Sequence, residues 1–284
     1  MQFVLIGTLN KRKNIDMNFS VLLSLYFREK TEHLNECLQS IHTQSLKPNE
    51  VVIVFDGPVG QNLRDIVTHW SRFLPIKLLK IKENVGLGQA LNKGLEVCSH
   101  EIVLRMDTDD VCSANRFKLQ IDKLENDKEL IVLGGHIDEY DEGLSTFIGK
   151  RIVPLDNEAI KKQVVIKNPF NHMTVAFRKS AVLAVGGYQH HAFMEDYNLW
   201  LRIIAAGYKV ENLDAVLVKA RTGHSMLLRR KGIEYVKSEM LLFKLKRKLQ
   251  IQPVHLCFIT FLVRSIPRLF PSSLLRICYK LQRK

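Results

Sequence analysis

The sequence predicts an α/β protein built on a doubly wound, mostly parallel sheet with helices on both faces. Apolar runs rich in strand-forming residues alternate with helically spaced segments between Phe19 and Met106, which is the pattern of this fold class. Two of these runs end in acidic residues, at Asp56 and at Asp107–Asp110. Because ligands of such sheets bind at the carboxyl ends of the strands, these acids are candidate site residues.

Four strands and three helices are expected in this first part of the chain. The first two strands, FSVLLSLY and EVVIVF, are nearly continuous apolar runs, as in strands that are buried on both faces. Lysines interrupt the third strand, which we expect to be more exposed. The expected strands are Phe19–Tyr26, Glu50–Phe55, Ile76–Ile81 and Glu101–Met106, and the expected helices are Thr31–Thr43, Asn62–Leu74 and Gly88–Ser99.

The second half of the chain has weaker patterns. Residues 138–170 alternate only weakly between apolar and polar, and residues 254–284 mix apolar with basic residues. A turn is expected at Gly186-Gly187. The further expected elements are helices at Phe117–Leu124, around Asp196–Ala206 and over 232–249, and strands at Leu130–Gly134 and Met173–Phe177.

The net charge of +13 is concentrated near the C-terminal end. Residues 219–284 contain 16 Lys or Arg and two acids, so the rest of the chain is nearly neutral. Such a segment is expected to meet an anionic partner, which could be lipid headgroups, a diphosphate or nucleic acid. The aromatic residues form no stacking platform and no nucleic-acid-binding motif is present, so we expect no nucleic-acid partner.

We expect neither a signal peptide nor a transmembrane segment. The apolar stretch Met1–Leu9 contains no basic residue, and the longest largely apolar run, Val254–Val263, is far below the roughly 20 residues that a bilayer requires. Residues 1–16 are expected to be an unstructured extension, with Met17 as an alternative start. The five scattered cysteines lack metal-binding spacing, which predicts reduced, buried thiols in a cytosolic compartment.

The acids after the fourth strand are a candidate metal site. Asp107, Asp109 and Asp110 repel one another unless a cation lies among them, and a divalent ion with oxygen ligands suits that place. Bound Mn²⁺ or Mg²⁺ would stabilise a nucleotide diphosphate as a leaving group. The alternative is a solvated acidic turn in which Asp109 or Asp110 caps the next helix.

Two other motifs invite functional interpretations. The turn Asn84–Gly88 precedes a helix and resembles a dinucleotide-binding loop, but Leu91 stands at the third glycine position and the clustered acids disfavour a bare phosphate. Glu195 and Asp196 begin a predicted helix, where Asp196 is a candidate general base for an attacking hydroxyl. The alternative is that both acids merely favour the helix dipole.

These motifs in their order resemble glycosyltransferase family 2. The resemblance covers Phe19–Ser225 and includes FSVLLSLY, Asp56, NVGLGQALNKG, DTDD, NPFNHMTVAFRK, the turn Gly186–Tyr188 and EDYNLW. The chain is similar to the bacterial subgroup that builds O-antigen, capsule or exopolysaccharide, including amylovoran-type transferases. The resemblance implies a GT-A fold, a nucleotide-sugar donor and inversion at the anomeric carbon.

The resemblance also implies roles for individual residues. His172 and His224 would by default be surface or core histidines without a functional role, but their positions in the matching motifs imply roles in the site. Gly57-Pro58 follows Asp56 where many members carry a second acid or serine, which departs from the family pattern. The implied donor-binding residues are Asp56, Asn84, Asn92, Asp107 and His172; the implied metal ligands are Asp107, Asp109 and His224; and the implied catalytic residues are Asp196 as the base, with Glu195 orienting it.

Together these features predict a hexosyltransferase at the cytoplasmic face of the bacterial inner membrane. We expect transfer of glucose or galactose from a UDP-sugar to a lipid-diphosphate-linked sugar such as GlcNAc-diphosphoundecaprenol, with a β-linkage. Residues 17–231 would form the catalytic domain, and 232–284 a basic amphipathic helical tail that binds anionic membrane, with Arg264 and Arg268 among its headgroup contacts. The alternative for the tail is a solvated helical face that packs on the body of the protein. A nucleotidyltransferase is the alternative enzyme, but Tyr26–Glu29 stands where it would carry a glycine-rich loop.

Overall fold

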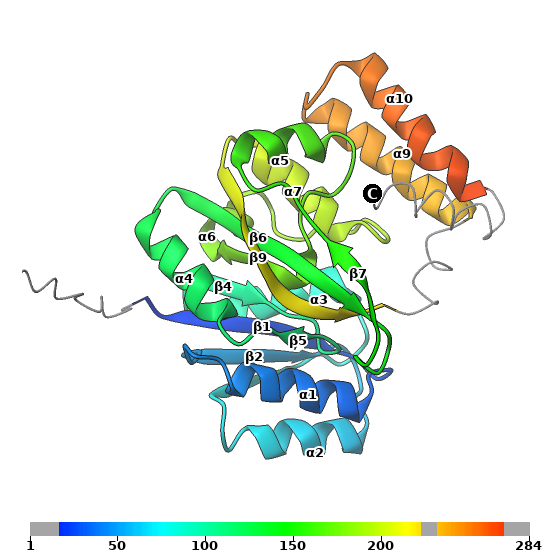
Figure 1. The fold of residues 1–284 in the computed structure, drawn as a ribbon. Coiled ribbons are helices and arrows are strands. Elements are labelled where there is room, and N and C mark those ends of the chain that lie inside the picture. The colour runs from blue at the N-terminus through cyan, green and yellow to red at the C-terminus, as the bar shows by residue number, and fades with distance from the viewer. Residues whose placement is uncertain (1–16, 223–231, 270–284) are drawn as a thin grey trace, which may run out of the picture.

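The computed structural model describes residues 17–222 and 232–269. Within them, one sheet contains nine strands, and its arrangement is drawn in Figure 1. The strands are β1 (Phe19–Leu25), β2 (Glu50–Phe55), β3 (Ile76–Lys80), β4 (Ile102–Arg105), β5 (Val111–Cys112), β6 (Leu130–Tyr140), β7 (Phe147–Arg151), β8 (Ala176–Arg178) and β9 (Lys209–Arg221).

Helices follow most of the strands, as the alternating pattern predicted. The strands and helices expected before Met106 all form, and their bounds differ by only a few residues from the expected ones. The helices are α1 (Thr31–His42), α2 (Gln61–Trp70), α3 (Leu87–Val97), α4 (Arg116–Asn126), α5 (Asn157–Val164), α6 (Lys179–Ala184), α7 (Glu195–Ala205), α9 (Ile233–Lys248) and α10 (Val254–Ser265), with 3₁₀ turns η1 (His172–Thr174) and η2 (Ile266–Leu269).

The strand order places β3, β2, β1 and β4 at one side of the sheet and β8, β6, β9 and β5 at the other. Strands β3, β2, β1 and β4 lie in this order and are all parallel. Strand β8 then joins β4 to β6 by antiparallel pairing, and β6 runs parallel to β9. The predicted α/β fold class is confirmed, and the carboxyl ends of β1, β2 and β4 share one edge.

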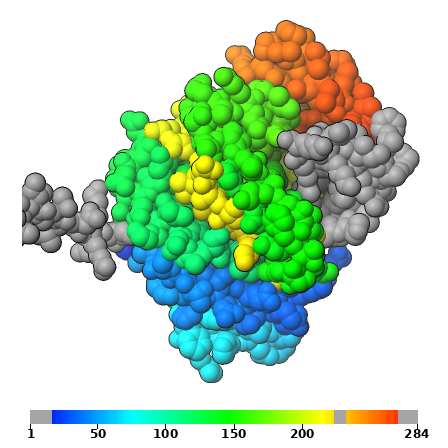
Figure 2. Space-filling model, viewed as in Figure 1, coloured from blue at the N-terminus to red at the C-terminus, as the bar shows by residue number. Residues whose placement is uncertain are grey.

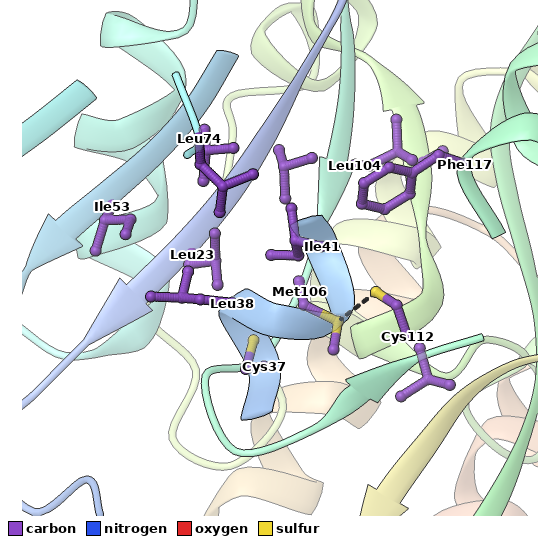
Figure 3. Packing of buried hydrophobic residues seen from close by; sticks show 14 of the residues in the cluster. Leu23, Cys37, Leu38, Ile41, Ile53, Leu74, Leu104, Met106, Cys112 and Phe117 are labelled. Carbon is purple, nitrogen blue, oxygen red and sulfur yellow. Dashed lines mark hydrogen bonds between the residues drawn. The ribbon is translucent and has the colours of Figure 1, made fainter. Parts of the chain in front are cut away.

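Helices cover both faces of the parallel strands because alternate strand residues point to opposite sides. Leu23 of β1 packs in one core cluster with Leu38 of α1, and Figure 3 shows this packing together with the Met106–Cys112 sulfur contact at 3.5 Å. Leu22 belongs to the opposite cluster, under α3. A Cβ at Gly94 of α3 would lie 2.4 Å from Leu22 Cδ1, so this glycine allows α3 to lie close to the sheet.

Some expectations for the second half were wrong. The longest strand, β9, was not predicted, because Lys209 and Glu211 break its apolar pattern while pairing with charged neighbours. Residues 173–177 were expected to form one strand, but the Thr174 hydroxyl donates to Asn171 O and a 3₁₀ turn precedes β8. The described cysteines are buried, as expected, and none of them forms a disulfide with another described cysteine; their redox state stays a prediction.

The C-terminal helices α9 and α10 pack against each other beside α5 and α7 (Figure 1). Figure 2 shows their orange surface directly against the green surface of the second half. Among the described helices, none combines the length and apolar character needed to cross a membrane. The basic helix predicted over 232–249 is present as α9. The region of mixed apolar and basic residues after it begins with a second helix, α10.

Candidate active site

Three carboxylates converge immediately after β4. One oxygen from each of Asp107, Asp109 and Asp110 lies within 4.8 Å of the others, at the edge where the parallel strands end. Burial, followed by the charges of Asp107 and Glu29, raises the pKa of Asp109 to about 7. Burial and the charge of Asp109 also raise the pKa of Asp110 well above its usual value. A cation among these oxygens would offset both effects, so the donor set fits Mn²⁺ or Mg²⁺.

The three acids differ in their protein partners. Arg105, which is 2% exposed, donates from one terminal nitrogen to Asp107 Oδ2 at 2.6 Å and from the other to Oδ1. Asp110 accepts the Arg221 backbone N–H at 2.9 Å. Asp109 forms no ion pair among the residues that the structure describes, which leaves its carboxylate the most available of the three for a metal ion.

Neighbouring chain segments fix the backbone of this cluster. The Thr108 hydroxyl donates to Glu29 at 2.6 Å, and the Cys37 thiol donates to Asp107 O at 3.3 Å. The Arg221 guanidinium donates to Asp109 O and pairs with Glu36. His224, the third implied metal ligand, lies in 223–231, outside the described residues.

Asp56 organises the turn that opens α3. Its buried carboxylate accepts the backbone N–H groups of Val85 at 2.7 Å and Gly86 at 3.1 Å, and the side-chain amide of Asn84 at 3.0 Å. Gly57 has φ +86°, and a Cβ there would lie 2.7 Å from Asn84 N, so the two segments touch. Asp56 and Asn84 thus lie together at the predicted nucleotide pocket, and their contact with a nucleotide stays a prediction.

Asn92 ties α3 to the glycine turn before the second acidic site. Its amide donates to Tyr188 O at 2.7 Å and accepts from Tyr188 N at 2.8 Å. Gly187 has φ +59°, and a Cβ there would lie 2.6 Å from Asn92 Oδ1. A Cβ at Gly88 would lie 3.3 Å from Glu195 Cγ. The start of α3 therefore lies against the start of α7.

Glu195 and Asp196 begin α7, as predicted. Asp196 Oδ2 accepts the Asn168 side-chain amide at 2.6 Å. Burial, and to a smaller extent the charge of Asp196, raises the pKa of Glu195. The two acids thus differ: Asp196 is oriented by an amide donor, and Glu195 is biased toward its neutral form.

His172 and Tyr188 lie between the two acidic sites. His172 Nε2 is 2.8 Å from the Tyr188 hydroxyl. Burial, and then the charge of Arg105, holds the pKa of His172 well below its usual value, so the imidazole is neutral at physiological pH. Burial raises the pKa of Tyr188, the charge of Arg105 opposes this rise, and the charges of Asp196 and Asp107 add to it. Tyr188 is therefore within electrostatic range of both acidic sites.

Four functional candidates were not singled out in the sequence. Arg105, Tyr188 and Asn168 contact predicted site residues directly, and Glu29 contacts Thr108. A signal existed for two of them: Arg105 is the charged residue within an otherwise apolar strand, and Asn168 opens the NPFNH motif. Nothing in the local pattern distinguishes Glu29 from an ordinary exposed acid.

The α/β sheet, with an aspartate cluster after β4 and an acid pair on α7, has the architecture of GT-A-like glycosyltransferases. Residues 20–186 match the model of glycosyl transferase family 2. The chain belongs to glycosyltransferase family 2, and the predicted family is confirmed.

Curated relatives and a solved structure agree with this assignment. The chain is 46% identical to amylovoran biosynthesis glycosyltransferase AmsE of Erwinia amylovora, over 94% of this chain and 99% of that protein. It is 38% identical to the UDP-Gal:alpha-D-GlcNAc-diphosphoundecaprenol beta-1,3-galactosyltransferase of Escherichia coli, over 78% and 80% of the two chains. The mannosyltransferase PcManGT of Pyrobaculum calidifontis, solved with GDP-Man and Mn²⁺, shares the fold with a TM-score of 0.62 at 17% identity, covering 93% of this chain and 80% of that chain.

Proposed function

We propose that this enzyme transfers a hexose, glucose or galactose, from a UDP-sugar to a lipid-diphosphate-linked saccharide such as GlcNAc-diphosphoundecaprenol. The reaction inverts the anomeric centre, forms a β-linkage and serves O-antigen or exopolysaccharide synthesis. The observation that carries this proposal is the presence of two distinct acidic sites: the aspartate cluster and Asp196. Tyr188, the hydrogen-bond partner of His172, is within electrostatic range of both. The names of the amylovoran and galactosyl relatives support the substrate class, and galactose is the first donor to test.

The aspartate cluster forms the donor half of the proposed site. Asp107, Asp109 and Asp110 would hold Mn²⁺ or Mg²⁺. Asp109 is the best placed because, in the described structure, it lacks both the Arg105 partner of Asp107 and the Arg221 N–H donor of Asp110. When bound, the cation would neutralise the leaving diphosphate. Mn²⁺ in the related mannosyltransferase structure supports this choice of ion. The turn held by Asp56 would shape the nucleotide pocket beside the cluster.

The start of α7 forms the acceptor half. We assign Asp196 as the general base that removes the proton from the acceptor hydroxyl as this oxygen attacks the anomeric carbon. Asn168 holds one Asp196 oxygen and leaves the other for the substrate. A base on the side opposite the leaving diphosphate gives inversion, and Glu195, next to Asp196 at the start of α7, would orient the base or contact the acceptor.

The tail is proposed to bind the cytoplasmic face of the bacterial inner membrane peripherally. Large apolar side chains cover the outer side of α10, including Ile259, 51% exposed, and Val263, 59% exposed. The side chains of Lys244, Arg247 and Lys248, in the last turns of the preceding helix α9, are exposed and would contact anionic headgroups. The expectation that Arg264 meets headgroups was wrong, because it turns inward and pairs with Glu239.

A donor and acceptor panel tests the catalytic proposal. The purified full chain is incubated with UDP-glucose, UDP-galactose or UDP-GlcNAc and Mn²⁺, with and without a synthetic GlcNAc-diphosphate-lipid. Released UDP and the extended lipid are measured, and NMR reads the anomeric configuration. We expect one UDP-hexose to give a metal-dependent, β-linked product. An α-linked product, or turnover that is unchanged by EDTA, would contradict the proposed mechanism.

Vesicle flotation tests the membrane proposal. The double variant Ile259→Ser/Val263→Ser should bind vesicles of anionic phosphatidylglycerol at least about fivefold more weakly, because it removes apolar surface that would enter the interface. Leu183→Ser removes an apolar side chain of comparable exposure, 45%, from α6 and is the matched control. Equal flotation of the double variant and the control would exclude the α10 face.

A further inference from the structure

The inner side of α9 combines apolar and polar residues. Its buried residues are Tyr235, Ser238, Glu239, Leu242 and Lys246, of which Tyr235 and Leu242 belong to a hydrophobic core cluster. Apolar packing alone does not require the buried hydroxyl, carboxylate and ammonium groups of Ser238, Glu239 and Lys246. The inner polar groups have specific partners, and these partners lie on both sides of the proposed base.

The first set of contacts holds the segment before Asn168. Lys246 Nζ donates to Val165 O at 2.7 Å, and Arg264 donates from a terminal nitrogen to Ile166 O at 3.0 Å. The Tyr197 hydroxyl, from α7, donates to Val164 O at 2.6 Å. Three successive carbonyls are thus fixed, and the chain then reaches Asn168, which donates to Asp196.

The second set of contacts holds the loop that leads into α7. The Ser238 hydroxyl donates to Ala192 O at 2.8 Å. His191 Nε2 donates to Ser238 O at 2.8 Å, and its Nδ1 accepts from Asn198 at 3.1 Å. Phe193, which has φ +67°, stacks on Tyr235 with 5.5 Å between the ring centroids. The loop is therefore attached to α9 up to two residues before Glu195.

Buried charges join the two sets. Arg264 donates two hydrogen bonds to Glu239, at 2.7 and 2.8 Å, and Glu239 is 2% exposed. The charged ends of Arg264 and Lys246 each lie 5.3 Å from the centre of the Tyr197 ring, next in sequence to Asp196. Buried ionic groups are poor sources of stability, because desolvation offsets their attraction. Their best-supported use is to select one arrangement of the chain, here the one that presents Asp196.

We propose that the α9–α10 hairpin positions the catalytic base, with Lys246, Arg264 and Ser238 as positioning residues. The inference rests on the proposed role of Asp196 as the base. The hairpin contacts the 164–168 segment, which ends at the Asn168 donor to Asp196, and the 191–194 loop, which leads into the start of α7. The same hairpin carries the exposed apolar face of α10, so the element that would meet the lipid surface also orients the base toward a lipid-linked acceptor.

The test compares Lys246→Met and Ser238→Ala with Lys237→Met in the full chain. Lys237 is on the same helix but is exposed and pairs with Glu234, so its replacement is a matched control. For the two test variants we expect kcat for transfer to a detergent-dispersed acceptor to fall about 10- to 100-fold, since small misplacements of catalytic groups have effects of this size. The dissociation constant for UDP with Mn²⁺ should stay within about twofold of wild type.

Two further readouts separate positioning from general damage. The pH profile of kcat/KM should be displaced in Lys246→Met, because the environment of the base changes, and should be unchanged in Lys237→Met. Hydrogen exchange of 164–168 and 191–198 should be faster in both test variants, while β1 and β4 stay protected. Loss of UDP binding in parallel with transfer, or unchanged kcat in both test variants, would overturn the inference.

Failure of the proposed function would look different. If wild type transfers no sugar to any acceptor, the proposed reaction fails, and hydrogen exchange alone decides whether the hairpin holds these segments. Exchange that is unchanged in Lys246→Met and Ser238→Ala would then refute the positioning role, whatever the reaction is.

Discussion

The donor and acceptor halves of the site are built in different ways. The aspartate cluster follows one strand, and its main partner, Arg105, is two residues from Asp107 in the sequence. The acceptor half depends on distant segments: Asn168 lies 28 residues before Asp196, and Ser238 lies 46 residues after Ala192. The donor site thus rests on acids that are neighbours in the sequence, although Glu29, Cys37 and Arg221 hold their backbone, whereas the acceptor site is assembled from segments that are far apart in the sequence. We expect the two halves to respond differently to substitution.

The largest effect should come from Asp196→Asn. The amide keeps the shape of the side chain and its contact with Asn168, but it cannot take a proton, so kcat should fall about 10³-fold. Binding of UDP with Mn²⁺ should stay within about twofold, because the substitution leaves the donor half intact. Single-turnover transfer and calorimetric titration of UDP measure the two quantities. A loss of both would mean that the halves are not separable.

Asp109→Asn should produce the opposite pattern. It removes the carboxylate that we assign as a direct metal ligand. Loss of a residue that only supports a metal ligand weakens metal affinity by up to about 100-fold, so loss of a direct ligand should weaken the apparent affinity for Mn²⁺ by at least about that factor. UDP binding measured with Mn²⁺ should weaken in parallel, and excess metal should restore part of the transfer rate. Metal affinity equal to wild type would assign the site to other residues.

Within the aspartate cluster, Asp107 should matter for the stability of the metal-free protein and Asp109 should not. Asp107→Asn leaves the buried Arg105 guanidinium without its ion pair and should lower the free energy of unfolding by about 3–5 kcal/mol. Asp109 has no such pair among the described residues, so Asp109→Asn should not destabilise the metal-free protein. Urea unfolding without metal compares the variants directly. Equal destabilisation by both would show that the Arg105 pair does not set the difference.

The donor half was predictable because its determinants are local. Apolar strands that are buried on both faces stand out in the sequence, and acids at their ends mark the edge where ligands bind. Asp107, Asp109 and Asp110 lie within one turn, so their proximity did not require knowledge of the fold. The partner of Asp107, Arg105, was missed although it is the charged residue within an otherwise apolar strand, because that signal does not show which acid the arginine pairs with.

The acceptor half was predictable only as the pair Glu195 and Asp196. The alternation of basic and apolar residues in the tail predicts two faces, but it does not show which basic side chains turn inward. Arg264 was expected to contact lipid headgroups but pairs instead with Glu239. Lys246 donates a hydrogen bond to Val165 O in the 164–168 segment. Such contacts depend on where the hairpin docks, and periodicity contains no information about docking.

The smallest predicted effect concerns the pH dependence of stability at the hairpin. Burial lowers the pKa of Lys246 to about 8, while the pKa of an unfolded lysine is about 10.4. Between these values the unfolded chain binds more protons, so wild type should gain stability as pH rises from about 8 to 10.4. The gain over this range should be on the order of 2–3 kcal/mol relative to Lys246→Met, which lacks the titrating group.

Thermal unfolding of wild type, Lys246→Met and Lys237→Met at several pH values measures this gain. The constant loss of the bond to Val165 O cancels when each protein is compared with itself at pH 7.5. Lys237→Met should follow wild type, since Lys237 is exposed. Parallel curves of stability against pH for wild type and Lys246→Met would show that Lys246 is exposed to solvent. Of the two charged side chains proposed to hold the 164–168 segment, only Arg264 would then remain.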